Sequence, residues 1–373
     1  MDILKKNNML FQARNKTRIV SVGNVKIGGG NLISVQSMTN TDTCDTGKTL
    51  TQIREIAKRG ADIVRVAVPD DEAARALREI VEKSPLPIVA DIHFDYRLAL
   101  LAIEAGVAKL RINPGNIGDK EKVRKVAAAA KNKNIPIRIG VNAGSLENEL
   151  AEAVRDRKLS LGDAMCESAL TQAAVLAQCD FHDIVISVKS SHIPDTFQAY
   201  RKLAELCDYP LHIGITEAGS AEAGIVKSAV GIGALLAEGI GDTIRVSLTG
   251  PPEEEVIVGR RILQALGLRA YGPEIISCPT CGRTQVDVLK ISEELQKKIQ
   301  NDAALKNKNC TIAVMGCVVN GPGEASAADI GFAGGKNCGI IFKNGEKICK
   351  VSADEAADKL LEELREFTDE TDK

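Results

Sequence analysis

Three cysteines near the C-terminus have the spacing of a metal or cluster site. Cys278 and Cys281 form the pair in "CPTCGR", and Cys317 follows in "GCVVNGPGEA". A Cys-x-x-Cys turn directs backbone N–H groups toward thiolate sulfur, a feature that zinc ribbons and iron–sulfur proteins share. The pair alone favours zinc, and the rest of the region must decide between the two.

A zinc ribbon needs a second paired knuckle, which this region lacks, because its other cysteines are at least six residues apart: Cys310, Cys317, Cys338 and Cys349. Glu324, seven residues after Cys317, can instead supply a replaceable oxygen ligand. Three thiolates and one carboxylate suit a 4Fe-4S cluster whose unique iron can exchange its ligand for substrate. The alternative for Glu324 is a surface glutamate that opens the helix of "EASAADI".

Polar residues also gather where predicted strands end. They are Arg65, Asp91, His93, Arg111, Asn113, Arg138, Asn142, Lys189, Glu217, Arg245 and Ser247. Five are basic, and cations on otherwise apolar strands are costly unless they bind a strongly anionic ligand. Together they predict a site for a phosphorylated or diphosphorylated small molecule, although any one of them could form a salt bridge instead. His93, two residues after Asp91, is a candidate acid or base; its alternative is a core histidine bonded to a backbone carbonyl.

The elements that must position these residues alternate between β-branched runs and amphipathic helical stretches. We predict eight strands, at residues 32–38, 62–68, 87–93, 109–113, 136–142, 183–189, 210–216 and 243–248. Parallel strands joined by helices in this number fit a TIM (β/α)8 barrel, and a doubly wound sheet is the alternative. A barrel builds its active site where its strands end, which is where the polar residues lie.

The pattern changes near residue 271. Strands are predicted at 274–278, 311–316 and 338–342, and helices at 286–302 and 352–367. We therefore expect a barrel domain over residues 1–270 and a small α/β domain over residues 271–373 that carries the cysteines.

Composition excludes several classes of partner and location. The chain has 373 residues and a net charge of −2, which gives no reason to expect nucleic acid or an anionic membrane as a partner. We find neither a signal peptide nor a membrane-spanning stretch, and expect a cytoplasmic protein. Its ten cysteines are then expected to be thiols or metal ligands.

Several motifs together resemble a known family. "VQSMTNTDT", "ADIHFDYRLAL", "LRINPGNIG", "GITEAG", "CPTCGR" and "MGCVVNGPGEA" occur in the order seen in the bacterial 4-hydroxy-3-methylbut-2-en-1-yl diphosphate synthases. The similarity runs from about residue 18 to past residue 325. It implies a homodimer in which a TIM barrel precedes a 4Fe-4S domain resembling the sulfite reductase fold, with the barrel mouth of one subunit facing the cluster of the other.

The resemblance also implies a reaction, which is the two-electron reductive opening of 2-C-methyl-D-erythritol 2,4-cyclodiphosphate in non-mevalonate isoprenoid biosynthesis. The implied electron donor is flavodoxin or ferredoxin. By position, the cluster ligands are Cys278, Cys281, Cys317 and Glu324. The implied diphosphate ligands are Arg65, Arg111, Asn113, Arg138, Asn142, Lys189, Arg245 and Ser247. Proton transfer is implied for Asp91, His93 and Glu217.

Two other classes of function remain open at the level of sequence. A transferase on a pterin-binding type of barrel would use the same anion site without redox chemistry, with zinc as a structural metal. A non-catalytic binding module would need neither Glu217 nor a replaceable metal ligand. Iron and sulfide content would separate both from the reductase.

Overall fold

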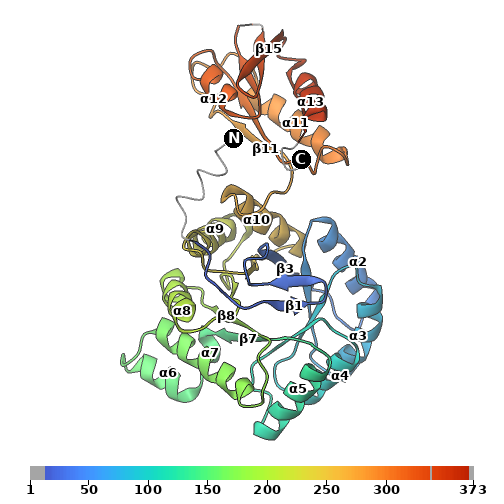
Figure 1. Cartoon of the computed structure of the whole chain (residues 1–373), viewed down its shortest axis with the longest axis vertical. Coiled ribbons are helices and arrows are strands. Elements are labelled where there is room, and N and C mark those ends of the chain that lie inside the picture. The colour runs from blue at the N-terminus through green and yellow to red at the C-terminus, as the bar shows by residue number, and fades with distance from the viewer. Residues whose placement is uncertain (1–12, 337, 369–373) are drawn as a thin grey trace. The chain divides into compact units, whose positions relative to one another are not determined.

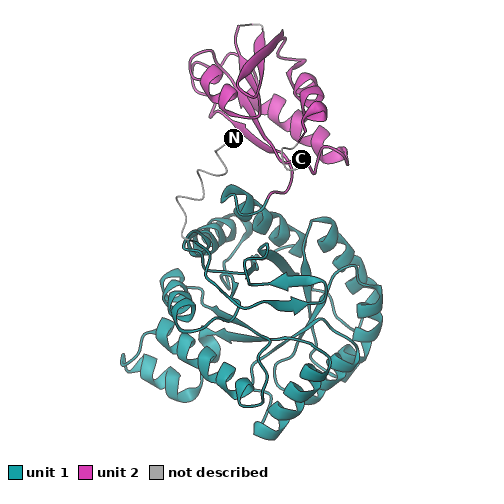
Figure 2. Cartoon of the chain, in the orientation of Figure 1, with its two compact units in different colours: residues 1–269 teal, residues 270–373 magenta. Residues whose placement is uncertain are grey.

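The computed structural model describes residues 13–336 and 338–368, and these form two compact units. The first unit extends to Arg269 and the second begins at Ala270 (Figure 2). Among the described residues, no helix is long and apolar enough to cross a membrane.

The first unit is a closed barrel of eight parallel strands surrounded by helices (Figure 1). The strands are β3 (Ser34–Met38), β4 (Ile63–Ala67), β5 (Ile88–Asp91), β6 (Lys109–Ile112), β7 (Ile137–Asn142), β8 (Ile184–Lys189), β9 (His212–Ile213) and β10 (Thr243–Ile244). Hydrogen-bonded neighbours follow the order β8-β7-β6-β5-β4-β3-β10-β9, and a parallel bridge between Ile186 and Leu211 joins β8 to the chain entering β9. This closure confirms the predicted barrel and excludes the doubly wound alternative.

All eight strands lie within the predicted runs, but the last two are shorter than expected. The predicted runs 210–216 and 243–248 each contribute only two residues to the ladder. Beyond the ladder, one parallel bridge still joins Ser220 to Thr249. The chain there turns into loops at the barrel mouth, where Glu217 takes a left-handed conformation.

The helices that surround the barrel include α2 (Thr46–Lys58), α3 (Asp71–Lys83), α4 (Tyr96–Glu104), α5 (Lys120–Asn132), α7 (Leu161–Ala177), α8 (Ile193–Leu206), α9 (Ala221–Ala237) and α10 (Pro252–Ala265). The first five of these begin at side-chain caps that the sequence provides. Asp45, Asp70 and Asp119 each accept a backbone N–H from the first turn of the helix that follows, at 3.0, 2.9 and 3.0 Å. Such caps fix where each helix starts and therefore where each strand-to-helix loop ends.

The barrel unit also contains a short hairpin, a 3-10 turn and a short helix. A hairpin of β1 (Val20–Val22) and β2 (Val25–Ile27) packs Val22 and Ile27 against Ile63 and Val89. After β7 come a 3-10 turn, η1 (Ala143–Ser145), and helix α6 (Asn148–Arg155). Helix α6 covers the first part of the stretch 150–162, up to residue 155, and α7 begins at residue 161.

The second unit is a five-stranded sheet of order β11-β12-β13-β14-β15. Its elements are β11 (Glu274–Ser277), α11 (Val288–Asn301), β12 (Thr311–Met315), α12 (Gly321–Ala327), β13 (Ile330–Gly334), β14 (Gly339–Lys343), β15 (Glu346–Val351) and α13 (Ala356–Glu366). Helices α11 and α13 bury one apolar cluster against the sheet, and α12 contributes to a second, smaller cluster. The three predicted strands and two predicted helices are all present; β13 and β15 are additional.

Candidate functional site

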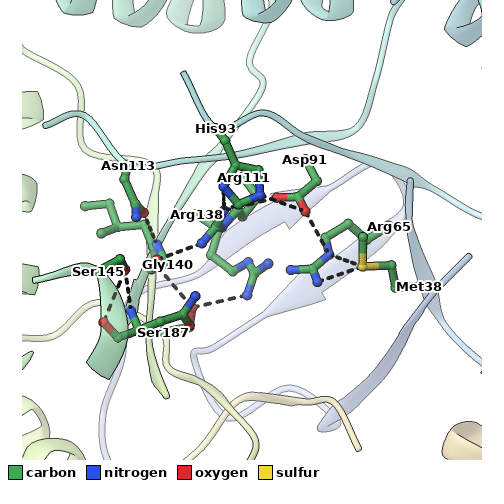
Figure 3. A network of polar contacts seen from close by, with 12 residues as sticks. Met38, Arg65, Asp91, His93, Arg111, Asn113, Arg138, Gly140, Ser145 and Ser187 are labelled. Atoms are coloured by element: carbon green, nitrogen blue, oxygen red, sulfur yellow. Dashed lines mark hydrogen bonds and ion pairs between the residues drawn. The ribbon is translucent and has the colours of Figure 1, made fainter. Parts of the chain in front are cut away.

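Most of the predicted residues that lie on barrel strands share one face of the sheet, which is the barrel interior. Asp91 pairs with Arg111 across β5 and β6, and Arg111 pairs with Arg138 across β6 and β7. On the next pair of strands, Asn142 pairs with Lys189. Paired residues on neighbouring strands project to the same side, and alternate residues of one strand do likewise. Strand geometry therefore brings these separate sequence positions together, as Asp91, Arg111 and Arg138 illustrate (Figure 3).

Asp91 is the buried anion around which part of this site is arranged. Its carboxylate oxygens lie 3.7 Å from Nε of Arg65, 3.4 Å from Nη1 of Arg111 and 3.5 Å from Nε2 of His93. Burial acts to raise the pKa of this carboxyl, but Arg65, the hydrogen bond to His93 and Arg111 outweigh it and hold the pKa well below its usual range. Asp91 therefore stays ionised and orients the two arginines.

Arg111 is held over a glycine. Its Nη2 donates to the carbonyl of Gly140 at 2.8 Å, and the N–H of Gly140 donates to Oδ1 of Asn113 at 2.9 Å (Figure 3). A Cβ at position 140 would lie 2.6 Å from Nε of Arg111. Only glycine at this interior position leaves room for the guanidinium.

Arg138 and Lys189 are buried cations that form no ion pair with a carboxylate among the described residues. Nη1 of Arg138 donates to Oγ of Ser187 at 3.1 Å, while its Nε and Nη2 have no hydrogen-bond partner among the described residues. Burial, with Arg245, Arg138 and Arg65 nearby, lowers the pKa of Lys189 well below its usual value. Buried donors without acceptors are costly, so a ligand with several anionic oxygens would be stabilised here.

The N–H donors of Arg65 face a weak hydrogen-bond acceptor. Its Nε and Nη2 lie 3.0 and 2.7 Å from Sδ of Met38, and a thioether sulfur accepts hydrogen bonds only weakly. Burial lowers the pKa of Arg65 to about 10, even with Asp91 nearby to raise it, so the side chain remains charged at neutral pH. An anionic oxygen would be a better partner for these donors than sulfur.

The remaining predicted residues lie at the rim. Asn142 and Ser247 are half-buried, whereas His93 and Glu217 are exposed. Glu217 has a backbone φ of +51°, a left-handed conformation that non-glycine residues adopt at a cost and that is frequent at functional sites. Arg245 is mostly buried, with its Nε 3.5 Å from Oε2 of Glu255.

In the second unit, the predicted metal ligands line one pocket of about 150 Å³. Cys278, Cys281, Cys317 and Glu324 all contribute to its wall, together with Arg283. The N–H of Gly316 donates to Sγ of Cys278 at 3.2 Å. Backbone N–H groups of Asn320 and then Val319 lower the pKa of Cys317, which favours its thiolate. These are the conditions that a thiolate-bound cluster needs.

The turns that carry the cysteines are conformationally demanding. Thr280, between Cys278 and Cys281, has a φ of +50°, which is unusual for a β-branched residue. A Cβ on Gly316 would lie within 2.8 Å of the side chains of Thr284 and Val288.

Glu324 is exposed in the first turn of α12. This helix begins at Gly321, and not at Glu324 as the surface-glutamate alternative supposed. Among the described residues, no group of three or more His, Cys, Asp or Glu side chains is spaced to hold a metal ion as it stands.

Comparison with known protein families accounts for both units. Residues 17–260 match the GcpE TIM-barrel domain, and residues 274–366 match the GcpE protein C-terminal domain. The chain belongs to the GcpE family.

Curated relatives agree with this membership along nearly the whole length. The chain is 55% identical over 351 residues to "4-hydroxy-3-methylbut-2-en-1-yl diphosphate synthase (flavodoxin)" of Clostridium acetobutylicum, covering 94% of this chain and 99% of the relative. Proteins of the same name from Caldanaerobacter subterraneus and Geobacter sulfurreducens are 53% and 54% identical. These matches cover 97% and 94% of this chain and 100% and 98% of the relatives. The predicted resemblance is thereby confirmed at the level of family.

In this GcpE-family barrel, sequence reasoning missed three buried polar residues. Lys109 and His212 lie on the interior face, and neither Nζ of Lys109 nor either ring nitrogen of His212 has a hydrogen-bond partner among the described residues. Lys109 lies two positions before Arg111, and His212 two positions before Gly214. This alternation was the sequence signal that could have placed both residues on the interior face. Glu255 is on helix α10, and a search restricted to strand ends could not find it.

Proposed function

We propose that this chain reduces 2-C-methyl-D-erythritol 2,4-cyclodiphosphate to 4-hydroxy-3-methylbut-2-enyl diphosphate, a step of non-mevalonate isoprenoid biosynthesis. The observation that carries the proposal is the barrel interior, where the predicted cations outnumber the buried carboxylates and several donors lack acceptors. A substrate with two phosphate groups supplies the missing acceptors. Family membership and the names of the relatives support the same reaction.

In this proposal the diphosphate is bound mainly by the strand-borne cations. Arg138 and Lys189 offer buried N–H donors, and Arg65 exchanges the sulfur of Met38 for phosphate oxygen. Neutral donors complete the set. The proposed ligands are Arg65, Arg111, Asn113, Arg138, Asn142, Lys189, Arg245 and Ser247.

The reaction consumes two electrons and two protons, opens the ring at a carbon–oxygen bond and releases a hydroxyl as water. We assign the management of protons to Asp91, His93 and Glu217, with His93 and Glu217 as the proton donors and Asp91 as the group that orients His93. Ionised Asp91 orients His93 and the arginines. Glu217 and His93 are exposed, so either can regain a proton from solvent after donating it.

We assign Cys278, Cys281, Cys317 and Glu324 as ligands of a 4Fe-4S cluster. Three thiols and a carboxylate, with a backbone N–H donated to sulfur, fit the needs of such a cluster. When bound, such a cluster supplies electrons singly and offers a Lewis-acidic iron. The chain's part is to stabilise three thiolates through backbone N–H groups, as at Cys278 and Cys317. Glu324 would contribute a carboxylate, which binds iron more weakly than a thiolate does and would leave one ligand position of the cluster replaceable.

The partners follow from the same proposal. The relatives' names specify flavodoxin, and we propose flavodoxin as the electron donor, with ferredoxin as the alternative. We further propose a homodimer in which the cysteine pocket of one subunit completes the barrel mouth of the other. Free thiols and a reducible cluster suit the cytoplasm.

Anaerobic purification tests the function and the cofactor together. We expect a brown protein with about four irons and four sulfides per chain, which converts the cyclodiphosphate when supplied with a low-potential reductant. A colourless protein that contains zinc and lacks this turnover would contradict the proposal and favour a transferase or a binding module.

Subunit mixing tests the composite site. Glu217→Gln damages the barrel and Cys281→Ser damages the pocket, and each homodimer should be inactive. A heterodimer of the two has one intact composite site and one doubly damaged site, so activity should return on mixing. If verified subunit exchange restores nothing, the site is built within one chain.

A further inference from the structure

Glu255 is a buried carboxylate at the barrel mouth that does not come from a strand. It belongs to the first turns of α10, the last helix of the barrel, and only 5% of its side chain is exposed. A carboxylate near a helix N-terminus is favoured by the helix dipole. Because buried acidic residues are rare without a partner, the contacts of Glu255 define what it does.

The two oxygens of Glu255 have separate partners. Oε1 accepts the backbone N–H of Leu248 at 3.1 Å, which ties α10 to the chain leaving β10. Oε2 lies 3.5 Å from Nε of Arg245 and accepts a longer hydrogen bond, 3.4 Å, from Oγ of Ser37 on β3. One oxygen thus holds the backbone, and the other faces a cation of the proposed diphosphate site.

Among the described residues, Glu255 is the only carboxylate that forms an ion pair with the Arg245 side chain, and it approaches the guanidinium at Nε. Contact at Nε leaves the two terminal nitrogens free to bind a ligand. Its charge also raises the pKa of Arg65 and of Lys189, which are otherwise lowered by burial and by neighbouring cations. Glu255 therefore acts through its charge on three cations of the proposed site, which are Arg245, Arg65 and Lys189.

We propose that Glu255 is a positioning residue that fixes Arg245 in the geometry needed to bind a diphosphate group. This inference rests on the proposed function, since it assigns Arg245 to the substrate. A carboxylate beside the guanidinium holds it by charge, so that the side chain loses less conformational freedom when the ligand binds. The competing role for Glu255 is purely structural. Its hydrogen bond with the N–H of Leu248 would then only hold the connection between β10 and α10 in place.

Glu255→Gln separates the two roles, because the amide oxygen can still accept the N–H of Leu248 while the charge beside Arg245 is lost. Glu254→Gln is the matched control, since Glu254 is the exposed neighbour on the same helix. Calorimetry with inorganic pyrophosphate measures binding independently of turnover. We expect Glu255→Gln to bind pyrophosphate about tenfold more weakly, to raise KM by a similar factor with kcat nearly unchanged, and to melt with the control.

A double-mutant cycle supplies the decisive readout. If Glu255 acts through Arg245, adding Glu255→Gln to Arg245→Ala should weaken pyrophosphate binding no further. Multiplicative losses, unchanged binding in Glu255→Gln, or a variant that fails to fold would each overturn the positioning role. If the wild type binds pyrophosphate but does not reduce the cyclodiphosphate, the proposed function fails while the role of Glu255 stands. If it binds no pyrophosphate, the anion site and the role of Glu255 fall together.

Discussion

The barrel interior and the cysteine pocket place their functional groups in opposite ways. The interior carries charged side chains on β-strands, where ladder pairing and contacts such as those of Asp91 hold them while mostly buried. The pocket carries thiols on turns, and Cys281 and Glu324 are exposed. Strand-borne groups are positioned by the whole sheet, whereas turn-borne groups depend on a few local backbone conformations, such as that of Thr280. The barrel should therefore fail gradually when one residue is changed, and the pocket abruptly.

The largest effect is expected at the pocket. Cys281→Ser removes a thiolate ligand, and we expect loss of most of the iron and of all measurable turnover, with the barrel still folded. Iron analysis and the visible spectrum measure the first, and a turnover assay the second. Cys338→Ser changes another exposed cysteine of the same unit and should behave as wild type. Full iron content in Cys281→Ser would remove this residue from the ligand set.

Replacing Glu324 sharpens the pocket side of the comparison. Glu324→Cys offers a fourth thiolate, so we expect the cluster to be retained or strengthened while turnover is abolished, because the replaceable position is closed. Glu324→Ala should lose much of the activity. Iron content and turnover are measured side by side. A Glu324→Cys protein with a full cluster and normal reduction of the cyclodiphosphate would show that this carboxylate is not the replaceable ligand, and Cys310 would be the next candidate.

A gradual failure is expected in the barrel for Arg138→Met. Loss of a charge-assisted contact to phosphate should raise KM by about 10- to 100-fold, which corresponds to roughly 1.5–3 kcal/mol. The melting temperature should rise at the same time, because methionine fills a similar volume without burying unpaired donors. Arg124→Met, at an exposed position of α5, is the control. An unchanged KM would exclude Arg138 from the site.

The smallest effect concerns Lys109, a wholly buried lysine that forms no ion pair with a carboxylate in the part of the chain that the structure describes. Burial, then Arg138 and Arg65, lower its pKa well below the usual value. Between that lowered pKa and the value of about 10.4 in the unfolded chain, the unfolded state binds more protons. The free energy of unfolding should therefore rise with pH across this window.

Lys109→Met removes this contribution. Urea unfolding at pH 7 and pH 10 should show a smaller increase in stability for Lys109→Met than for wild type. The variant should also be more stable at pH 7, by roughly 1–3 kcal/mol. If the two proteins gain stability equally between pH 7 and pH 10, Lys109 has no lowered pKa in the folded state.

The same contrast explains what the sequence could predict. Strands β4, β5, β7 and β8 are rich in isoleucine and valine, so their positions and the interior face that carries Arg65 and Arg138 follow from the sequence pattern. Strand β13, "IGFAG", is rich in glycine, and β15, "EKICKV", is a charged strand at the sheet edge. Neither has the apolar pattern of a buried strand. The turn Asn344–Gly345 between β14 and β15, with both φ values positive, was a usable hairpin signal.

The candidate site was predictable only where its residues stand at strand ends. The roles of Lys109 and Glu255 depend on which side chains face one another across the barrel, and the position of one residue along the chain does not determine this. The metal ligands were found from the spacing of cysteines and the turn residues around them. Their ligation remains a prediction, because spacing fixes the type of site and not the final distances.

The shortness of β9 and β10 has a consequence for motion. Strands β7 and β8 share six paired residues, whereas β9 joins β10 through two, and β10 joins β3 through two. Amide hydrogens are released by local opening, and opening is easiest where the fewest ladder bonds must break. Hydrogen exchange should therefore be faster at Ile213 and Ile244 than along β7. Glu217 and Arg245 follow these two strands. We therefore expect local opening of the barrel on the side that carries them, and little opening on the side built on Asp91, Arg111 and Arg138.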